Sequence, residues 1–217
     1  MTDFDTATRQ LPTVERTSAR VAASSLKRWL DVCVALFALV LLAPLLALVA
    51  IAIQIEDGGP VLFRQRRTGF HGRVFTVLKF RSMLVTEDAD DVLQVSKWDA
   101  RVTRVGALIR ALSIDELPQL YNVLKGDMSL VGPRPHAIRH DEAWGRAIPA
   151  YRHRFRARPG LTGYAQVCGY RGEVRDIAEI VGRTEADNYY IDNWSLKLEL
   201  LIVLRTLPLL FHDPNAY

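Results

Sequence analysis

The sequence is poor in cysteine and shows no internal repeat or low-complexity tract. Two of its 217 residues are cysteine, Cys33 and Cys168, and their spacing fits neither a zinc site nor a disulfide pair. This scarcity excludes a small disulfide-stapled fold and favours a reducing, cytosol-facing environment. The N-terminal residues are polar and mixed in charge, without the apolar core of a signal peptide. We therefore expect residues 1–25 to form a flexible cytoplasmic tail.

A large excess of either charge is also lacking. The chain has 28 Lys and Arg against 24 Asp and Glu, a net charge of +4 and an isoelectric point near 9.2. This balance suits an anionic partner, which leaves nucleic acid, phospholipid headgroups and phosphorylated substrates open. Apolar residues make up 49% of the chain, so it can bury a core, and its length favours one catalytic domain with a small addition.

One long run contains no charged side chain, and it covers residues 32–53. About 22 helical residues at 1.5 Å each reach about 33 Å, enough to cross the hydrocarbon core of a bilayer. A helix buried in a soluble core usually keeps a polar face, which this run lacks. We therefore predict a membrane helix over residues 26–57.

The residues leave the topology of this helix open. Basic residues flank the run on both sides, at Lys27 and Arg28 before it and at Arg64, Arg66, Arg67 and Arg73 after it. Both ends are therefore expected on the cytoplasmic side, and Pro44 near the centre predicts a bend. A re-entrant helix, however, frees backbone groups at the bend that need partners within hydrocarbon. Re-entrant and spanning geometries thus both remain.

The rest of the chain, residues 58–217, predicts an α+β domain that is mainly helical. A strand starts at Val61, a turn follows at residues 69–72, and a second strand covers residues 74–80, which makes a small β-hairpin. Helical spacing follows at residues 104–112, and residues 159–163 predict a turn-rich loop. Residues 195–211 are apolar with interspersed charges, which predicts a membrane-associated amphipathic helix.

Two adjacent carboxylates, Asp115 and Glu116, occupy the predicted first turn of a helix. Ser113 and Glu116 match a capping box, in which each side chain would bond the backbone N–H of the other. The positive end of the helix dipole favours ionised acids there. Lys125 and Gly126 predict the end of this helix.

Basic residues around this acidic pair suggest phosphate chemistry. The candidate phosphate-binding residues are Lys79, Arg81, Arg110, Arg134 and Arg158, with Arg134 held between two prolines. Phosphoryl transfer needs cations to neutralise oxygen charge and a nucleophile held in line. A carboxylate can be that nucleophile by forming an acyl phosphate. Neighbouring carboxylates also favour Mg²⁺, so Asp115 and Glu116 are the predicted metal ligands.

The motifs along the chain resemble those of the bacterial sugar transferases, the monotopic phosphoglycosyl transferases that start polyprenol-linked glycan assembly. The resemblance runs from about residue 26 to residue 207. Its motifs are Gly59-Pro60-Val61-Leu62-Phe63-Arg64-Gln65, Lys79-Phe80-Arg81-Ser82-Met83, Asp115-Glu116-Leu117-Pro118-Gln119-Leu120, Gly126-Asp127-Met128-Ser129-Leu130-Val131-Gly132-Pro133-Arg134-Pro135, Arg158-Pro159-Gly160-Leu161-Thr162-Gly163 and Tyr190-Ile191-Asp192-Asn193-Trp194-Ser195.

The resemblance implies a two-step reaction at the cytoplasmic face of the bacterial inner membrane. Asp115 would attack the sugar-bearing phosphate of a UDP-sugar, expel UMP and carry the sugar phosphate, which undecaprenyl phosphate then accepts. Glu116 would assist through Mg²⁺ and proton handling, and Arg134 would lie near the nucleotide or phosphate. The family also has a re-entrant helix broken at a proline, which fits Pro44.

The sugar is less constrained than the reaction. The segments Pro135-His136-Ala137 and Gly169-Tyr170-Arg171-Gly172-Glu173 resemble the subgroup that transfers glucose-1-phosphate for exopolysaccharides. Glucose is therefore favoured, with galactose and N-acetylated or diamino sugars as competitors. The expected partners are a UDP-sugar, undecaprenyl phosphate and membrane lipids, without nucleic acid, and a homodimer is left open.

Two other functions compete with this interpretation. A membrane-anchored basic module could grip anionic lipid or nucleic acid through its arginines, although this leaves Asp115 and Glu116 unexplained. A metal-dependent polyprenyl-phosphate hydrolase would use the same carboxylates but no nucleotide sugar. Release of UMP separates these functions from sugar-phosphate transfer.

Overall fold

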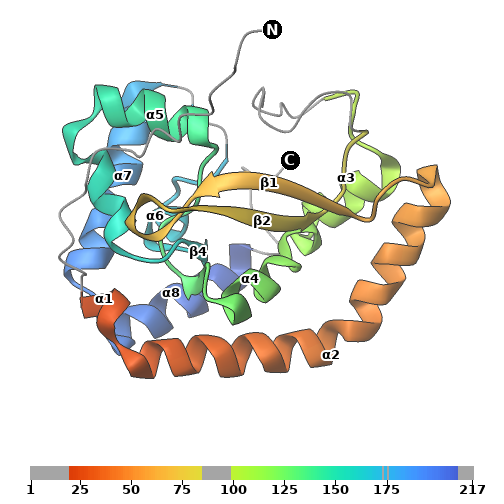
Figure 1. Ribbon diagram of the computed structural model, residues 1–217, viewed down its shortest axis with the longest axis horizontal. Helices are drawn as coiled ribbons and strands as arrows, with labels where there is room; N and C mark the ends of the chain where they lie inside the picture. Colours follow the sequence, from red (N-terminus) through yellow and green to blue (C-terminus); the bar gives the residue numbers. More distant parts are fainter. Residues whose placement is uncertain (1–19, 85–98, 173, 175, 210–217) are drawn as a thin grey trace, which may run out of the picture.

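The computed structural model describes residues 20–84 and 99–209, apart from 173 and 175. The predicted tail lies mostly in residues 1–19, outside the described residues. The described chain is mainly helical with two small sheets (Figure 1), so the predicted α+β class is confirmed. The elements are α1 Arg20–Ala23, α2 Ser25–Asp57, β1 Leu62–Thr68, β2 Val74–Phe80, α3 Arg104–Ala111, α4 Gln119–Lys125, β3 Ser129–Val131, α5 Ile138–Ala147, β4 Gly160–Thr162, α6 Tyr164–Val167, α7 Ile177–Asp192 and α8 Leu196–Leu209, with 3₁₀ turns η1 Phe70–Gly72, η2 Ile114–Glu116 and η3 Pro149–Arg156.

The predicted hairpin is confirmed. Strands β1 and β2 pair antiparallel, from Leu62 opposite Phe80 to Thr68 opposite Val74. The chain reverses at η1, where Gly72 has a φ of 74° that a residue with a side chain rarely adopts. Val77 and Phe80 are both buried and lie in two different apolar clusters, so the hairpin contributes to two parts of the core.

A second sheet was not predicted. Strands β3 and β4 pair in parallel, with Ser129 opposite Gly160 and Val131 opposite Thr162. The prediction of a loop over residues 159–163 is therefore wrong for residues 160–162. A Cβ on Gly160 would lie 2.1 Å from the backbone nitrogen of Gly132, so the backbones meet there without a side chain between them. Three-residue strands carry no readable period, which is why the pairing escaped the sequence analysis.

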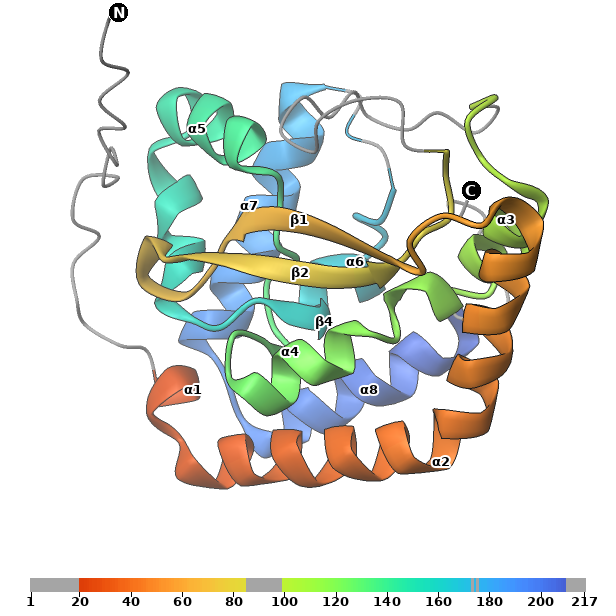
Figure 2. The same cartoon turned by 45° about the vertical axis from the view of Figure 1, so that its right-hand side comes forward.

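The predicted apolar helix is observed as α2, one continuous helix of 33 residues. Ser24 caps its start by accepting a hydrogen bond from the Lys27 N–H, and Gly58 ends it in the left-handed conformation. Pro44 lies inside the helix, and the ribbon turns between the two ends (Figures 1 and 2). By length and composition it can cross a membrane: its most apolar window has a mean hydropathy of 3.0, and 11% of that window is buried.

Both halves of α2 pack against the same domain. Ala35 in the first half lies in a core with Val77 and Val123. Val49 and Ile53 in the second half lie in another core with Phe80 and Ile109. The hairpin, α3 and α4 therefore sit within the angle of the helix (Figure 2).

The outer side of α2 leaves large apolar residues uncovered, among them Trp29, Phe37, Val40 and Leu48. Helix α8, close to the amphipathic helix predicted at residues 195–211, also exposes leucines, including Leu200 and Leu204. Water disfavours so large an exposed apolar surface, which is typical of proteins that contact a membrane or a partner.

Asn122 joins α4 to the hairpin. Its side chain is 2% exposed, donates to the Thr76 carbonyl at 2.8 Å and accepts from the Leu78 N–H at 3.0 Å.

We expect Asn122→Ala to lower the free energy of unfolding by about 1–3 kcal/mol, because both backbone groups of β2 lose their partner. Denaturant unfolding in detergent micelles measures the change. The control is Tyr121→Ala on the exposed side of α4, expected within about 0.5 kcal/mol of wild type; equal values for the two variants would contradict this role.

Candidate functional site

The predicted acidic pair lies in η2, the turn between α3 and α4. The predicted capping box is wrong. Ser113 has a left-handed backbone with φ 55° and makes no capping hydrogen bond, and its hydroxyl instead accepts from Arg171 at 2.8 Å. The Glu116 side chain is drawn away from the backbone because two cations bind it, and charge-assisted contacts are stronger than a bond to a neutral N–H.

Glu116 is held by Lys79 and Arg134. Its Oε1 accepts from Lys79 Nζ and from Arg134 Nη2, both at 2.7 Å, and Arg134 Nη1 lies 3.2 Å from Oε2. These contacts join β2, η2 and the loop after β3. Burial alone would raise the pKa of Glu116, but the charges of Arg134 and Lys79 outweigh it and hold that pKa well below its usual range. Glu116 is therefore ionised at neutral pH.

The neighbouring Asp115 lies in a different environment. Its side chain is buried, with 8% of the residue exposed, and no hydrogen bond or ion pair joins it to another residue of the described chain. Burial raises the pKa of Asp115; the charge of Lys79 opposes the shift and that of Glu116 adds to it. The two adjacent carboxylates therefore differ. Glu116 forms ion pairs with two cations, whereas the Asp115 carboxylate has no such partner in the part of the chain that the structure describes. Neighbouring acids whose environments differ in this way commonly have different chemical roles.

The other candidate cations divide into two groups. The charge of Arg110 on α3 lowers the pKa of Asp115, as do the charges of Lys79 and Arg134. Arg81 instead forms an ion pair with Asp57 at the end of α2. Arg158 donates to the Gly126 carbonyl at 3.1 Å and lies 5.1 Å from the centre of the Phe70 ring. The structure therefore does not bring Arg81 and Arg158 into contact with the acidic pair.

A buried polar network, which the sequence analysis missed, supports the Arg134 loop. Arg154 is 3% exposed and donates to the Arg134 carbonyl at 2.6 Å and to Asp187 at 2.8 Å. It also donates to the Tyr151 hydroxyl at 2.9 Å. In the sequence, Arg154 is one of several alternating basic residues that suggest surface charge, and no local signal shows that one of them is buried.

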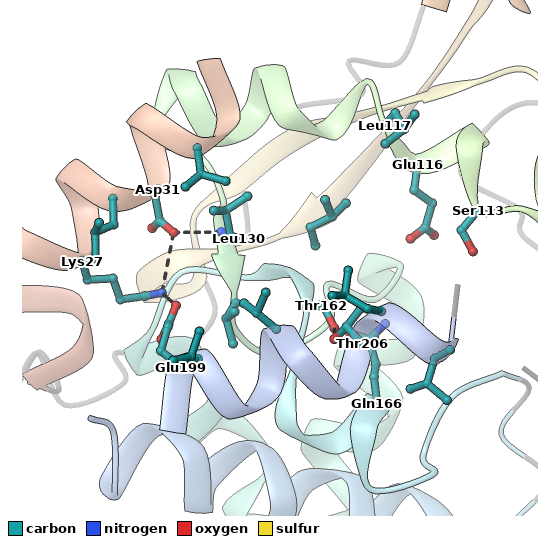
Figure 3. Close-up of a pocket in the computed structure, with 18 of the residues that line it drawn as sticks. Lys27, Asp31, Ser113, Glu116, Leu117, Leu130, Thr162, Gln166, Glu199 and Thr206 are labelled. Carbon is teal, nitrogen blue, oxygen red and sulfur yellow. Dashed lines mark hydrogen bonds and ion pairs between the residues drawn. The ribbon is translucent and has the colours of Figure 1, made fainter. Parts of the chain in front are cut away.

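A cavity of about 550 Å³ lies between α2 and α8 and extends to Glu116 (Figure 3). Ser113 and Glu116 lie at one end, and Lys27, Asp31 and Glu199 lie at the other. Most of its wall is apolar. The cavity could not be predicted from the sequence, because its lining comes from segments far apart in the chain. Its polar lining residues other than Glu116 were not predicted as site residues; they are Lys27, Asp31, Ser113, Thr162, Gln166, Arg171, Glu199 and Thr206.

The two predicted metal ligands fit Mg²⁺ only as part of a set. No group of three or more His, Cys, Asp or Glu that could hold a metal occurs among the described residues. Asp115 is uncommitted, and Glu116 Oε2 makes a single contact at 3.2 Å, which leaves a lone pair on that oxygen. Mg²⁺ commonly takes one or two protein carboxylates and completes its shell with water and substrate phosphate. The residues therefore fit an ion that arrives with a phosphorylated substrate, and the cofactor stays a prediction.

A buried carboxylate without a bonding partner among the described residues, close in the sequence to cavity-lining residues and influenced by nearby cations, is compatible with a transferase that handles phosphate groups. Comparison with known protein families identifies one that matches most of the chain. The model of the bacterial sugar transferase family matches residues 22–213, and the chain belongs to that family.

Curated relatives carry related names. A UDP-glucose:undecaprenyl-phosphate glucose-1-phosphate transferase of Caulobacter vibrioides is 54% identical over 198 residues, covering 91% of this chain and 74% of the relative. One of the same name from Klebsiella pneumoniae is 45% identical, covering 88% of this chain but 41% of the relative. A UDP-N-acetylgalactosamine-undecaprenyl-phosphate N-acetylgalactosaminephosphotransferase of Aeromonas hydrophila is also 45% identical, covering 84% of this chain and 43% of the relative. The chain thus spans less than half the length of two of these three relatives.

The charge of Lys79 should set the acid limb of the pH profile. A carboxyl with a raised pKa loses its charge at a higher pH than usual, so a reaction that needs ionised Asp115 fails as the pH falls through that pKa. Lys79 opposes the shift, so Lys79→Met should move the acid limb of kcat/KM for sugar-phosphate transfer to higher pH. The control is Lys125→Met, which removes a surface cation paired with Asp127. An acid limb that stays in place or moves to lower pH would contradict the assignment.

Proposed function

We propose that the protein transfers a sugar-1-phosphate from a UDP-sugar to undecaprenyl phosphate and releases UMP, which starts the assembly of an exopolysaccharide or another lipid-linked glycan. The observation that carries this proposal is the Asp115 carboxylate, which is buried, uncommitted and surrounded by cations. The names of the relatives from Caulobacter and Klebsiella support both the donor and the acceptor.

The reaction proceeds in two displacements at one phosphorus. A carboxylate oxygen of Asp115 attacks the phosphorus that bears the sugar, the bond from that phosphorus to the bridging oxygen breaks, and UMP leaves with the bridging oxygen. A phosphate oxygen of the acceptor then attacks the same phosphorus and breaks its bond to Asp115. Both steps place negative charge on phosphate oxygens, which Arg110, Lys79 and Arg134 lie close enough to stabilise.

Glu116 has a supporting role in this scheme. Its low pKa keeps it ionised, which favours holding a metal and orienting Lys79 and Arg134 over the proton handling that the resemblance implies. Mg²⁺ held by Asp115, Glu116 and the donor diphosphate would neutralise charge on the leaving UMP. Arg134 is rigid at the moment of reaction because Arg154 holds its backbone, so little reorganisation is needed.

The proposed topology is a re-entrant helix bent at Pro44, with both ends on the cytoplasmic face of the bacterial inner membrane. Near the start of α2, Arg28 donates to the Val123 and Leu124 carbonyls at 2.7 and 2.9 Å. Near its end, Glu56 accepts from the Arg104 N–H at 2.7 Å, and Asp57 binds Arg81. A straight spanning helix would separate these contacts by the thickness of the bilayer. The homodimer stays a prediction.

The sugar proposed first is glucose. The relatives from Caulobacter and Klebsiella are named for glucose, whereas the Aeromonas relative, as similar as the Klebsiella one, is named for N-acetylgalactosamine. Overall identity therefore does not separate these sugars. A panel of UDP-sugars with UMP release as the readout tests the assignment, and UDP-glucose is expected to give the highest kcat/KM.

Asp115→Asn tests the nucleophile. We expect sugar-phosphate transfer to fall by at least about 1,000-fold, because an amide cannot form the acyl phosphate. A radiolabelled UDP-sugar with undecaprenyl phosphate measures transfer, and incubation with the donor alone tests for UMP and a labelled protein adduct. Glu185→Gln, which neutralises an exposed acid on α7, should keep wild-type activity. Retained transfer by Asp115→Asn would remove Asp115 from this role, and the absence of UMP release by wild type would favour a basic binding module or a hydrolase.

Removal of divalent cations tests the proposed cofactor. We expect EDTA to abolish UMP release and added Mg²⁺ to restore it, because the site offers two carboxylates and needs substrate phosphate to complete a metal shell. The control is EDTA saturated with Mg²⁺ before it is added. Undiminished turnover in free chelator would contradict a metal requirement.

A further inference from the structure

The cavity between α2 and α8 has walls that suit a hydrocarbon chain. Leu30 and Val34 line it from α2, and Leu200 and Val203 line it from α8. Its volume of about 550 Å³ falls in the range of roughly 300–1,000 Å³ that is usual for ligand pockets. The hydroxyls of a sugar or nucleotide would find few partners along such walls, and unpaired polar groups there are costly. The wall chemistry therefore favours an apolar occupant.

The two ends of the cavity differ in charge. At the end near the acidic pair, Arg171 donates to Ser113 at 2.8 Å and to the Leu209 carbonyl at 3.2 Å, and both Arg171 and Ser113 line the cavity. The carboxylate of Glu116, also in the lining, is already neutralised by Lys79 and Arg134. A phosphate at this end would thus meet a guanidinium and a hydroxyl, and it would replace some of the contacts that Arg171 already makes.

The far end is closed by groups that already have partners. Lys27 forms ion pairs with Glu199 and with Asp31, the latter at 3.7 Å. Glu199 also accepts from the Tyr190 hydroxyl and the Trp194 ring N–H, both at 2.8 Å. These mutual contacts leave little capacity for a polar ligand, so this cluster closes the cavity (Figure 3).

The cavity also joins the outer apolar surface. Val34 is 47% exposed and Leu200 is 59% exposed, although both line the cavity. A chain could therefore enter sideways from a bilayer, between α2 and α8, without crossing water.

We propose that this cavity holds the first isoprene units of the acceptor lipid, with the acceptor phosphate at the end formed by Arg171 and Ser113. The assignment rests on the proposed function and deepens it. It accounts for an apolar cavity with a guanidinium and a hydroxyl at one end, which complement the hydrocarbon chain and the phosphate of a polyprenyl phosphate. It also places the acceptor phosphate at the end of the cavity that Glu116 lines, and Glu116 directly follows Asp115 in the sequence.

A matched pair of variants on α8 tests the assignment. Leu200 lines the cavity, whereas Leu201 beside it does not. Leu200→Trp should lower kcat/KM for undecaprenyl phosphate at least about 10-fold, because the larger ring fills the channel, while Leu201→Trp stays within about two-fold of wild type. A soluble acceptor of two isoprene units should be less affected by Leu200→Trp, because it is too short to reach from the phosphate end to Leu200, which follows Glu199 of the closed end in the sequence. Equal effects of the two variants on the long acceptor would overturn the assignment.

The donor step separates this inference from the proposed function. UMP formed from UDP-glucose alone should be unchanged in Leu200→Trp and in Val34→Phe, which narrows the cavity from the α2 wall. If both variants lose this step while Leu201→Trp keeps it, the cavity serves the donor and the assignment is wrong. If wild type itself forms no UMP, the two-step function fails, whereas the difference between long and short acceptors still tests the cavity.

Arg171→Gln tests the phosphate end. We expect KM for undecaprenyl phosphate to rise at least about 10-fold with UMP formation from the donor alone unchanged, and Arg171→Lys to recover part of the loss. A variant that instead raises KM for the UDP-sugar would assign Arg171 to the donor and overturn its place in the proposal.

Discussion

The attachment of both ends of α2 to one domain is the constraint on which the rest of the structure depends. Lys27 and Arg28 fasten its start to α8 and α4, and Glu56 and Asp57 fasten its end to α3 and to Arg81. The apolar middle of the helix must therefore bend, because both ends are attached to the same domain. The same attachment forms one wall of the cavity and brings the acidic pair close to the apolar surface, so lipid contact and phosphate chemistry share one frame.

The proposed chemistry depends on the different surroundings of two neighbouring carboxylates, Asp115 and Glu116. Glu116 forms ion pairs with Lys79 and Arg134, and these contacts connect η2 to β2 and to the Arg134 loop. Asp115 is buried without such a partner, so its charge is available for reaction. The cations that bind Glu116 also favour the ionised form of Asp115. Glu116 thereby holds in place the positive charges that stabilise ionised Asp115.

The sequence predicted the features that depend on local signals. The turn at residues 69–72 between two apolar segments predicted the hairpin, Lys125 and Gly126 predicted the end of α4, and the uncharged run predicted α2. Features set by distant partners were not predictable: Ser113 fits a capping box in the sequence, yet Glu116 binds Lys79 and Arg134 instead. Arg81 and Arg158 looked equivalent to Lys79 because a sequence shows charge without direction. The pair β3 and β4 and the buried Arg154 depend on backbones and side chains that meet only after folding.

The ion cluster of Lys27, Asp31 and Glu199 at the far end of the cavity has a consequence for substrate range. With this end shut, the part of a bound prenyl tail beyond the cavity must leave sideways between α2 and α8 into the surrounding lipid. That remainder would touch no part of the protein that discriminates one length from another. On this geometry the enzyme would recognise only the phosphate end of the lipid and the isoprene units next to it, so carriers long enough to fill the cavity would be used with similar efficiency whatever their total length.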